Sequence, residues 1–297
     1  MSKLIKTIEK YRFNTFTEDQ NDETIEISGE LLSKTAYDLN GNLVLTQTFD
    51  SNGNANEHIE FSYNSANKIT EELIYDNEEV VEKRRFEYND NGNIILEKIF
   101  YLDDNFDSVH YSYNNGNKLI EKKLINSDNE TESIFTYTYQ ESKILNESEY
   151  DSENQLVDEK NYEYDEKGNL IKYSHFNAMD DITIQTTYEY DENNNRTKIL
   201  NYDNEGNLIS RSTYKYNDSK QVISLIEDTT LQSSTYQFEY DTNGKVISQK
   251  EFTEEEEIIA TITYTYDGNE IIETQSEGEG YTNNYIIKSE IEYYENE

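Results

Sequence analysis

Hydrophobic and polar residues alternate along this chain in short, regularly placed stretches. In Tyr162-Glu163-Tyr164 two aromatic residues flank one charged residue, and Phe86-Glu87-Tyr88 and Phe238-Glu239-Tyr240 share the pattern. Successive side chains of a β-strand point to opposite faces of the sheet, so the two aromatic residues share one face. An amphipathic helix would need apolar residues three and four positions apart, which these stretches lack. The pattern therefore predicts β-strands.

A repeat of about 25 residues tiles the chain. Its marker is the second aromatic residue of each aromatic–polar–aromatic triplet: Tyr63, Tyr88, Tyr113, Tyr139, Tyr164, Tyr190, Tyr216, Tyr240 and Tyr266. Successive markers lie 24 to 26 residues apart, and a similar spacing leads back to Tyr37 and Phe13 and forward to Tyr293. We therefore predict one repeat domain of about eleven units over residues 1–297, with an atypical first and last unit.

Each unit divides into two halves. A second aromatic–acidic pair lies midway, as in Tyr75-Asp76, Tyr150-Asp151 and Tyr202-Asp203. The resulting half-period of about 12–13 residues accommodates a strand of about seven or eight residues and a turn of about four or five. Two strands per unit are therefore expected.

Glycines mark the turns between these strands. Eight of the 11 glycines lie at the junctions: Gly41, Gly53, Gly92, Gly116, Gly168, Gly206, Gly244 and Gly268. All of these except Gly244 are followed by Asn. Glycine tolerates a positive φ because it has no Cβ, and Asp or Asn caps a turn through its side chain. The chain has no proline, which agrees with strands that use every backbone amide. We therefore predict β-hairpins with tight turns.

Tandem hairpins of this kind predict an all-β fold with about 22 short antiparallel strands in one long sheet. Laid flat at about 4.8 Å per strand, the sheet would extend on the order of 100 Å. Open sheets rarely exceed about ten strands without curling, and an aromatic face has to be covered. We therefore expect a coiled sheet, a spiral or partial shell, with aromatic residues inside and carboxylates outside. A solenoid with one unit per coil is the alternative.

The unit resembles the YD repeat of the RHS and teneurin proteins. In that family a Tyr-Asp pair, a few polar residues and a glycine precede a short apolar strand. The matching stretches are Tyr37-Asp38-Leu39-Asn40-Gly41, Tyr164-Asp165-Glu166-Lys167-Gly168, Tyr202-Asp203-Asn204-Glu205-Gly206 and Tyr240-Asp241-Thr242-Asn243-Gly244. The resemblance implies a long β-sheet that spirals into a hollow shell, in some members around a toxin domain. This chain is shorter than a full shell, has Asn after the turn glycine where the family often has Arg, and shows no separate domain after the repeats. The resemblance therefore carries the architecture but no activity.

Composition excludes several classes of function. The formal net charge is −38, from 63 acidic and 25 basic residues, so the protein should repel nucleic acid and anionic membranes. Low hydropathy with high charge is typical of disorder, but the 13% aromatic content and its regular spacing favour a folded chain. Without cysteine, the chain has neither disulfides nor thiolate chemistry. No stretch resembles a signal peptide or an apolar membrane span, so we expect a cytoplasmic protein, with signal-independent export as the alternative.

Neither catalysis nor metal binding has a specific signal. The three histidines, His58, His110 and His175, occupy non-equivalent places in the repeat, and carboxylate pairs are too abundant to be diagnostic. Residues 89–93 and 203–207 crowd oxygen ligands around a glycine, but they lack the alternating positions and the distal bidentate acid of a calcium loop. We therefore predict turns rather than calcium sites, no cofactor, and a protein that is not an enzyme.

The pattern breaks at four consecutive acids. Glu254, Glu255, Glu256 and Glu257 lie between Phe252 and Ile258, where other units have a turn with Asp or Asn. They form either a solvated loop or an electrostatic contact for a basic protein partner. The tyrosine stripe is interpreted as core, or as a binding groove if the sheet stays open.

We therefore favour a non-enzymatic repeat scaffold that binds another protein, with repeats that offer a long curved surface. By analogy with the YD-repeat family, this partner would belong to a bacterial toxin, immunity or delivery system. An acidic mimic of nucleic acid, which would occupy a nucleic-acid-binding protein, is the first alternative. A glycan-binding surface of exposed tyrosines is the second.

Overall fold

The alternating stretches form β-strands in the computed structural model, which describes residues 4–16, 25–26, 29–101, 105–268, 270–277 and 285–295. Strands of seven to ten residues follow one another with turns between them, except for the longer β1 and the two-residue β2. The strands are β1 (Ile5–Phe16), β2 (Ile25–Glu26), β3 (Glu30–Tyr37), β4 (Leu43–Phe49), β5 (Ala55–Tyr63), β6 (Ile69–Asp76), β7 (Glu79–Tyr88), β8 (Ile94–Phe100), β9 (Phe106–Tyr113), β10 (Leu119–Ile125), β11 (Thr131–Gln140), β12 (Lys143–Asp151), β13 (Leu156–Tyr164), β14 (Leu170–Asn177), β15 (Ile182–Tyr190), β16 (Arg196–Tyr202), β17 (Leu208–Tyr216), β18 (Val222–Thr229), β19 (Ser233–Tyr240), β20 (Val246–Phe252), β21 (Ile258–Asp267), β22 (Glu270–Glu277) and β23 (Tyr285–Tyr293).

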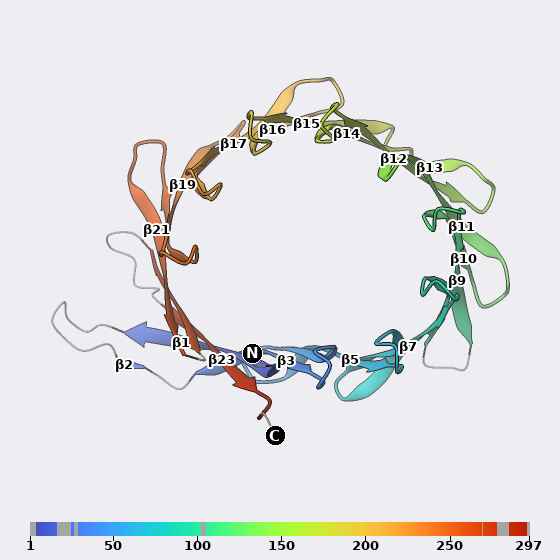
Figure 1. Ribbon diagram of the computed structural model, residues 1–297, viewed down its shortest axis with the longest axis horizontal. Coiled ribbons are helices and arrows are strands. Elements are labelled where there is room, and N and C mark those ends of the chain that lie inside the picture. Colours follow the sequence, from blue (N-terminus) through green and yellow to red (C-terminus); the bar gives the residue numbers. More distant parts are fainter. Residues whose placement is uncertain are drawn as a thin grey trace.

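These strands close into a ring. From β3 to β23 each strand pairs antiparallel with the next in sequence, and β1 pairs with both β23 and β3 (Figure 1). The short β2 pairs with the far end of β1, which leaves 22 strands in the ring. The predicted all-β fold of tandem hairpins is therefore confirmed.

Closure is where the structure departs from the expected spiral or partial shell. The first long strand, β1, pairs with the last, β23. The sheet is therefore closed and does not form a spiral with two open edges. Closing a sheet satisfies the backbone groups that an edge strand would expose, which favours a ring once the curvature brings the ends together. The solenoid alternative is wrong, because strands pair with their sequence neighbours and not with strands one unit away.

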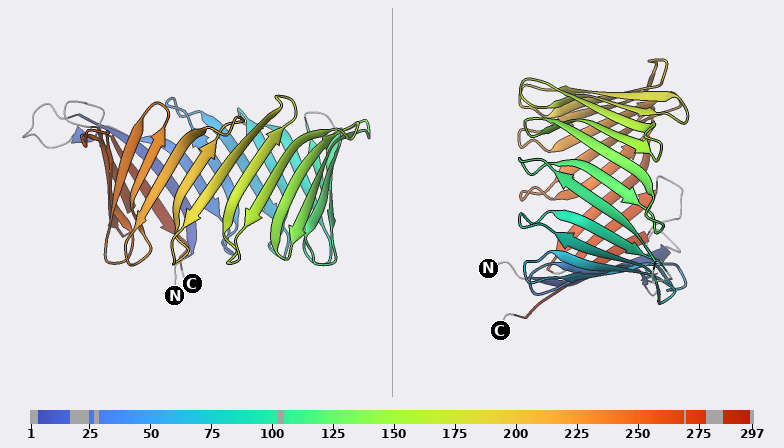
Figure 2. Two further views of the ribbon diagram at one scale, coloured as in Figure 1. Left: turned by 90° about the horizontal axis from the view of Figure 1, so that it is seen from above. Right: turned by 90° about the vertical axis from the view of Figure 1, so that its right-hand side faces the viewer.

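The ring has two different rims. Both chain termini lie at one end, here called the terminal rim, where turns follow the odd-numbered strands β3 to β21 (Figure 2). The opposite end, the distal rim, carries the turns that follow the even-numbered strands β4 to β20. Figure 1 shows the turns of the terminal rim inside the ring and the hairpin loops of the distal rim outside it. The ring is therefore wider at the distal rim.

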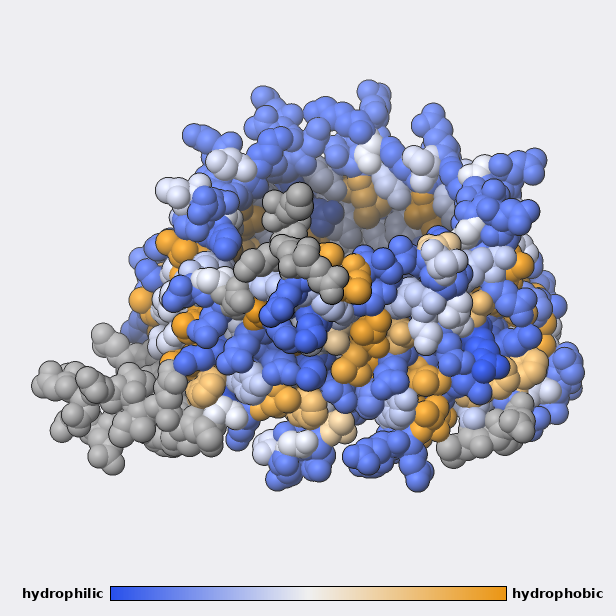
Figure 3. Space-filling view, turned by 60° about the horizontal axis from the view of Figure 1, so that its bottom comes forward, coloured by the Kyte–Doolittle hydropathy of each residue, from blue (hydrophilic) through white to orange (hydrophobic). Residues whose placement is uncertain are grey.

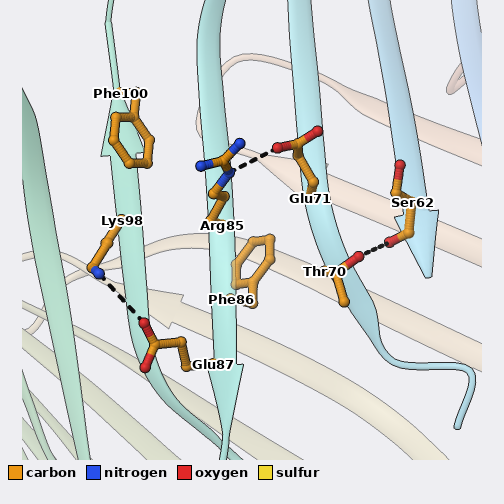
Figure 4. Close-up of a pocket in the computed structure, with 8 residues that line it drawn as sticks. All are labelled: Ser62, Thr70, Glu71, Arg85, Phe86, Glu87, Lys98 and Phe100. Atoms are coloured by element: carbon orange, nitrogen blue, oxygen red, sulfur yellow. Dashed lines mark hydrogen bonds and ion pairs between the residues drawn. The ribbon is translucent and has the colours of Figure 1, made fainter. Parts of the chain in front are cut away.

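Aromatic residues lie on both faces of the wall. Arg85 and Glu87 of β7 face outward, so the alternation along the strand directs Phe86 and Tyr88 into the lumen (Figure 4). By the cross-strand register, the second aromatic residue of each triplet lies on the inner face near the terminal rim. The midway aromatic residues lie on the outer face near the distal rim: Phe49, Tyr75, Phe100, Tyr150, Tyr202 and Phe252.

The expected separation of aromatic residues inside from carboxylates outside is therefore only partly right. Carboxylates such as Glu97 and Glu147 also line the lumen, because a hollow ring has two solvated faces. Among the described residues Val109, 3% exposed, is the one buried hydrophobic residue. The wall has no conventional core, and its stability rests on cross-strand pairs and on the hydrogen bonds between neighbouring hairpins.

A bulge shapes the hairpins of the terminal rim from β3–β4 to β19–β20, whereas the β21–β22 hairpin pairs without one. Tyr88 pairs with Ile94 whereas Glu87 pairs with Leu96, so Ile95 is an extra residue on β8. On the other side of β8, the ladder to β9 ends at the pair Leu96–His110, short of Ile94. The carbonyl of Ile94 then accepts a hydrogen bond of 2.8 Å from the Tyr113 hydroxyl of the next hairpin.

This hydroxyl–carbonyl bond recurs around the ring. At 2.6–2.9 Å, it joins each of these triplet tyrosines to the first residue of the preceding strand: Tyr63, Tyr88, Tyr113, Tyr190, Tyr216, Tyr240 and Tyr266. At the same position in their units, Tyr139 and Tyr164 have the ammonium groups of Lys118 and Lys143 over their rings. The tyrosine stripe therefore links one hairpin to the next.

Residues 162–171 show which hydrogen bonds stabilise a turn of the terminal rim. The Asp165 carboxylate accepts the Asn169 backbone N–H at 2.8 Å and the Asn169 side-chain amide at 2.9 Å, which lowers the pKa of Asp165. Gly168 adopts a φ of +92° and donates its N–H to the Asp165 carbonyl. Asn takes the same positive-φ position in other turns, for example Asn194. An amide side chain tolerates this conformation better than most residues with a Cβ, which explains why Gly and Asn are common at this position of the turns.

The other glycines that mark junctions mostly share this conformation. Positive φ values occur at Gly41, Gly53, Gly92, Gly168, Gly206, Gly244 and Gly268. Gly116 differs, because the residue with positive φ in its turn is Asn117, at 64°. Asn269, which follows Gly268, lies outside the described residues.

Removing one rim hydroxyl should weaken the whole ring. We predict that Tyr190→Phe lowers the free energy of unfolding by about 1 kcal/mol, because the Leu170 carbonyl loses its 2.8 Å partner. The matched control is Tyr188→Phe in the same triplet, whose hydroxyl has no hydrogen bond in the described part of the chain. Urea denaturation followed by circular dichroism measures both. Equal effects of the two substitutions would contradict a stabilising role of the rim bond.

Candidate binding surface

The distal rim is acidic and has no described cation in its turns. Its turn residues include Glu78, Asp128, Glu153, Asp180, Asp181, Glu205 and Glu254 to Glu257, and none of the described ones is Lys, Arg or His. The terminal rim differs, because lysines accompany the acids of its turns: Lys68, Lys118, Lys167, Lys220 and Lys245. The two ends of the ring therefore have different electrostatic character.

The four consecutive acids predicted as a partner contact lie on this rim. The segment keeps the geometry of the other five-residue turns, because Thr253 N–H donates to the Glu257 carbonyl at 2.9 Å. The Thr253 hydroxyl accepts the N–H groups of Glu255 and Glu257, as an Asp carboxylate does elsewhere, and Glu256 takes the positive φ of 63°. Glu254 to Glu257 are exposed and have no ion-pair partner among the described residues. They break the sequence pattern but not the fold.

Exposed apolar residues accompany these acids on the outer wall. Each lies on the strand that leaves a distal turn, opposite a midway aromatic residue: Val80 opposite Tyr75, Phe106 opposite Phe100, Leu208 opposite Tyr202, and Ile258 opposite Phe252. The side chains of Val80, Phe106, Leu208 and Ile258 are 38–48% exposed. Figure 3 shows apolar patches on the outer wall between polar regions. Apolar contact area therefore adjoins the acidic turns.

The outer wall nearer the terminal rim is charge-compensated instead. The polar residue of several triplets pairs with a lysine on the next strand: Glu87 with Lys98, Glu163 with Lys172, Glu189 with Lys198, and Glu239 with Lys250, at 2.7–3.6 Å. Exposed pairs of this kind contribute at most about 1 kcal/mol each. Their effect on recognition is to cancel charge along this part of the wall.

A groove of about 500 Å³ crosses strands β5 to β8 on the outer wall (Figure 4). Its cations are already engaged, since Arg85 Nε lies 2.8 Å from Glu71 Oε2 and Lys98 Nζ 3.4 Å from Glu87 Oε1. Arg85 also lies over the Phe100 ring, 5.6 Å from its centroid. With its charged groups paired internally, the groove offers little net charge to a ligand.

Carboxylates on the inner face of the wall are hydrogen-bonded to tyrosines or lie near an arginine. Glu97, 8% exposed, accepts a 2.7 Å hydrogen bond from the Tyr111 hydroxyl and lies 3.8 Å from Arg84 Nη1. Burial and the bond to Glu97 raise the pKa of Tyr111. Burial also raises the pKa of Glu72, partly opposed by Arg84. Tyr162 donates to Glu147 in the same way, at 2.8 Å. These lumen carboxylates are therefore hydrogen-bonded within the wall, and Figure 3 shows the lumen open at the end in view, with apolar side chains also inside it.

The three histidines lie in separate contacts on different strands. His58 Nε2 lies 3.2 Å from Glu60, His175 contacts Asp158, and His110 Nε2 lies 3.3 Å from the Ser108 hydroxyl. The sequence analysis did not predict the Ser108–His110 contact. Its only indication in the sequence is that the two residues are two positions apart and therefore share one face of a strand. It is exposed, and among the described residues no acid contacts the His110 ring, so the pair lacks the third member of a nucleophilic triad.

The two candidate calcium loops are occupied by the chain's own donors. Asp203 Oδ1 accepts the N–H groups of Glu205 and Asn207 at 2.9 and 2.8 Å, and Asn93 N–H donates to Asn89 Oδ1 at 3.0 Å. In the part of the chain that the structure describes, no group of three His, Cys, Asp or Glu side chains is placed to hold a metal ion. Nor do the described residues form a helix long and apolar enough to cross a membrane.

Comparisons with known proteins leave the function open. A family model described as "Uncharacterised protein" matches residues 9–132, less than half of the chain, and no curated protein matches. Among solved structures, the TcdB2-TccC3-Cdc42 crystal structure is 10% identical, with a TM-score of 0.23, over 91% of this chain and 23% of that one. A porin-like protein from Bacteroides uniformis is 11% identical, with a TM-score of 0.33, over 97% of this chain and 96% of that one. The Photorhabdus luminescens Tc holotoxin pore is 10% identical, with a TM-score of 0.23, over 92% of this chain and 23% of that one.

The chain thus spans about a quarter of the length of the toxin-complex chains to which it is similar. At these identities and scores the comparisons assign no activity, ligand or partner to it. The YD-repeat relationship therefore stays a resemblance in sequence pattern.

Tyrosine ionisation should unfold the ring at alkaline pH. Burial is the first cause that raises the pKa of many tyrosines, among them Tyr88, Tyr111, Tyr137, Tyr162 and Tyr188. A tyrosine whose folded-state pKa lies above its unfolded value of about 10 holds its proton more tightly in the folded protein. Its stabilisation is therefore complete below about pH 10 and is lost as the pH rises through the folded-state pKa.

We expect tyrosinate absorbance to rise steeply and cooperatively above about pH 10, together with loss of the β-sheet circular dichroism signal. Urea-unfolded protein, titrated in parallel, provides the control with ordinary tyrosine pKa values. Gradual ionisation of the tyrosines near pH 10 in a ring that stays folded would contradict the predicted coupling.

Proposed function

We propose that the protein is a non-enzymatic binding scaffold whose distal rim engages a basic protein. The observation that carries this proposal is the charge of that rim, whose described turns contain acids and no cation. The terminal rim, with its lysines, provides a contrast within the same molecule. Charge gathered at one end of a large ring directs a basic partner to that end and raises its association rate.

The neighbouring apolar residues supply the second half of an interface. Val80, Leu208 and Ile258 are exposed beside acidic turns, so a partner that reaches the rim can bury them. Apolar contact supplies affinity, whereas the exposed charges mainly supply orientation and steering. Since neighbouring hairpins are linked at the terminal rim, the distal turns are presented on a preformed frame.

The YD-repeat resemblance suggests bacterial toxin, immunity and delivery proteins as the first partners to examine. The nucleic-acid mimic is the competing proposal, because an acidic rim also suits a nucleic-acid-binding protein. The two proposals differ in whether nucleic acid displaces the partner.

The distal-rim variant replaces Glu254, Glu255, Glu256 and Glu257 with Gln. Its matched control replaces four exposed turn acids of the terminal rim, Asp90 and Asp218 with Asn and Glu166 and Glu192 with Gln, so both variants lose the same charge. Partners retained by the wild-type ring are identified by mass spectrometry, produced as pure proteins and measured by calorimetry at two salt concentrations.

We expect the distal-rim variant to bind a basic partner about tenfold more weakly, because four exposed charge contacts at roughly 0.3 kcal/mol each are lost. The control should bind within about twofold of wild type, and higher salt should weaken wild-type binding. Equal loss in both variants would reject the distal rim as the contact. Displacement of the partner by duplex DNA would favour the mimic.

A further inference from the structure

A slot opens on the outer wall at the distal rim because two neighbouring turns differ in length. The turn between β4 and β5 covers the five residues 50–54, whereas β6 and β7 are joined by Asn77 and Glu78 alone. Both of these residues have positive φ, 47° and 72°, as a two-residue hairpin turn requires. The shorter turn leaves a space of about 430 Å³ beside the longer one.

Aromatic rings form the floor of the slot and are fixed in place. The rings of His58 and Tyr75 stack with centroids 4.2 Å apart and planes 13° from parallel. Glu60 holds both, since Tyr75 donates its hydroxyl to Oε2 at 3.0 Å and His58 Nε2 lies 3.2 Å from Oε1. Phe49 and Ala55 complete the apolar side. The floor is therefore rigid before any ligand arrives.

The mouth of the slot is polar and negatively charged. Gln47, Asn54 and Asn77 contribute amide groups, and Glu78 is exposed with no ion pair among the described residues. No Lys or Arg lines the slot, in contrast to the groove of Figure 4, where Arg85 and Lys98 neutralise their neighbouring acids. Aromatic faces next to unpaired carboxylate and amide oxygens favour a cation.

We propose that this slot takes a lysine or arginine side chain of the basic partner, an inference that rests on the proposed function. The slot has room for such a side chain, with the methylene stem against Phe49 and Ala55. The charged head reaches Glu78 and the neighbouring amide oxygens. A planar guanidinium also stacks on an aromatic ring, so arginine is preferred to lysine.

The test uses N-acetyl-arginine amide as the probe and N-acetyl-citrulline amide as its uncharged analogue of nearly the same shape. Binding is followed by shifts of the Asn77 and Glu78 backbone amide signals in NMR spectra of the whole protein. The slot variants are Glu78→Gln and Tyr75→Leu. The matched control pair, Glu87→Gln and Phe100→Leu, alters the groove of Figure 4 instead. Thermal melting of every variant verifies that the ring is folded.

We expect the arginine probe to shift these signals in wild type and in the control variants, and to bind at least about fivefold more weakly to each slot variant. The citrulline probe should bind at least about fivefold more weakly than the arginine probe. Equal binding of the two probes, or equal binding to wild type and slot variants, would overturn the proposal. Shifts caused by a neutral sugar and not by the arginine probe would overturn it in favour of a glycan site.

Failure of the slot can be told from failure of the proposed function. If Glu78→Gln leaves both the arginine probe and the partner unaffected while the four-glutamate variant still weakens the partner, the slot is rejected and the rim proposal stands. If the probe binds the slot but Glu78→Gln does not weaken the partner, the slot is a site for free cationic molecules, and its assignment to a partner side chain is rejected.

Discussion

The hydrogen bond from a tyrosine hydroxyl to the first carbonyl of the preceding strand is the interaction on which the ring depends. At seven of the nine bulged hairpins of the terminal rim, the backbone ladder to the next hairpin ends early and a tyrosine hydroxyl satisfies the carbonyl that is left over, as at Ile94. Side chains of neighbouring turns add to the link, as where the Asn42 amide donates to Asn67 Oδ1 at 3.1 Å. A junction of the same kind, repeated along the chain, gives a similar bend each time, and equal bends close a circle.

This construction explains an unusual composition. A wall that is one sheet thick has solvent on both sides, so it needs few fully buried residues and accommodates many charges on either face. Aromatic rings pack over their cross-strand neighbours, and a lysine ammonium often lies over the ring. Lys245 Nζ, for example, lies 4.2 Å from the centroid of the Tyr266 ring. The large negative charge is therefore compatible with an ordered protein, because the repeat brings polar side chains together as partners along the wall.

Strands, turns and repeat length could be predicted because they depend on residues close together in the sequence. The triplets fix which face each aromatic residue takes, and Asp165 and Gly168 define a turn by themselves. Closure could not be predicted, since it depends on β1 meeting β23 across nearly the whole chain, which no local pattern encodes. The sequence also marked Glu254 to Glu257 as a break, whereas the structure shows an ordinary turn there. The slot had only a faint signal, a junction at Asn77-Glu78 that lacks both glycine and the usual length.

The seam between β1 and β23 has a consequence for assembly of the ring. Apart from β1 and β3, which lie on either side of the short β2, all other pairings join strands that are neighbours in sequence. Hairpins can therefore form one after another as the chain emerges, and a single late step joins the two ends. Bringing such distant ends together adds only a modest entropic cost, because that cost grows with the logarithm of loop length. Until the seam forms, however, both outermost strands expose unpaired backbone groups that fit any similar strand. Nascent rings in a crowded cell are therefore exposed to chain exchange with one another, and the finished seam ends that hazard.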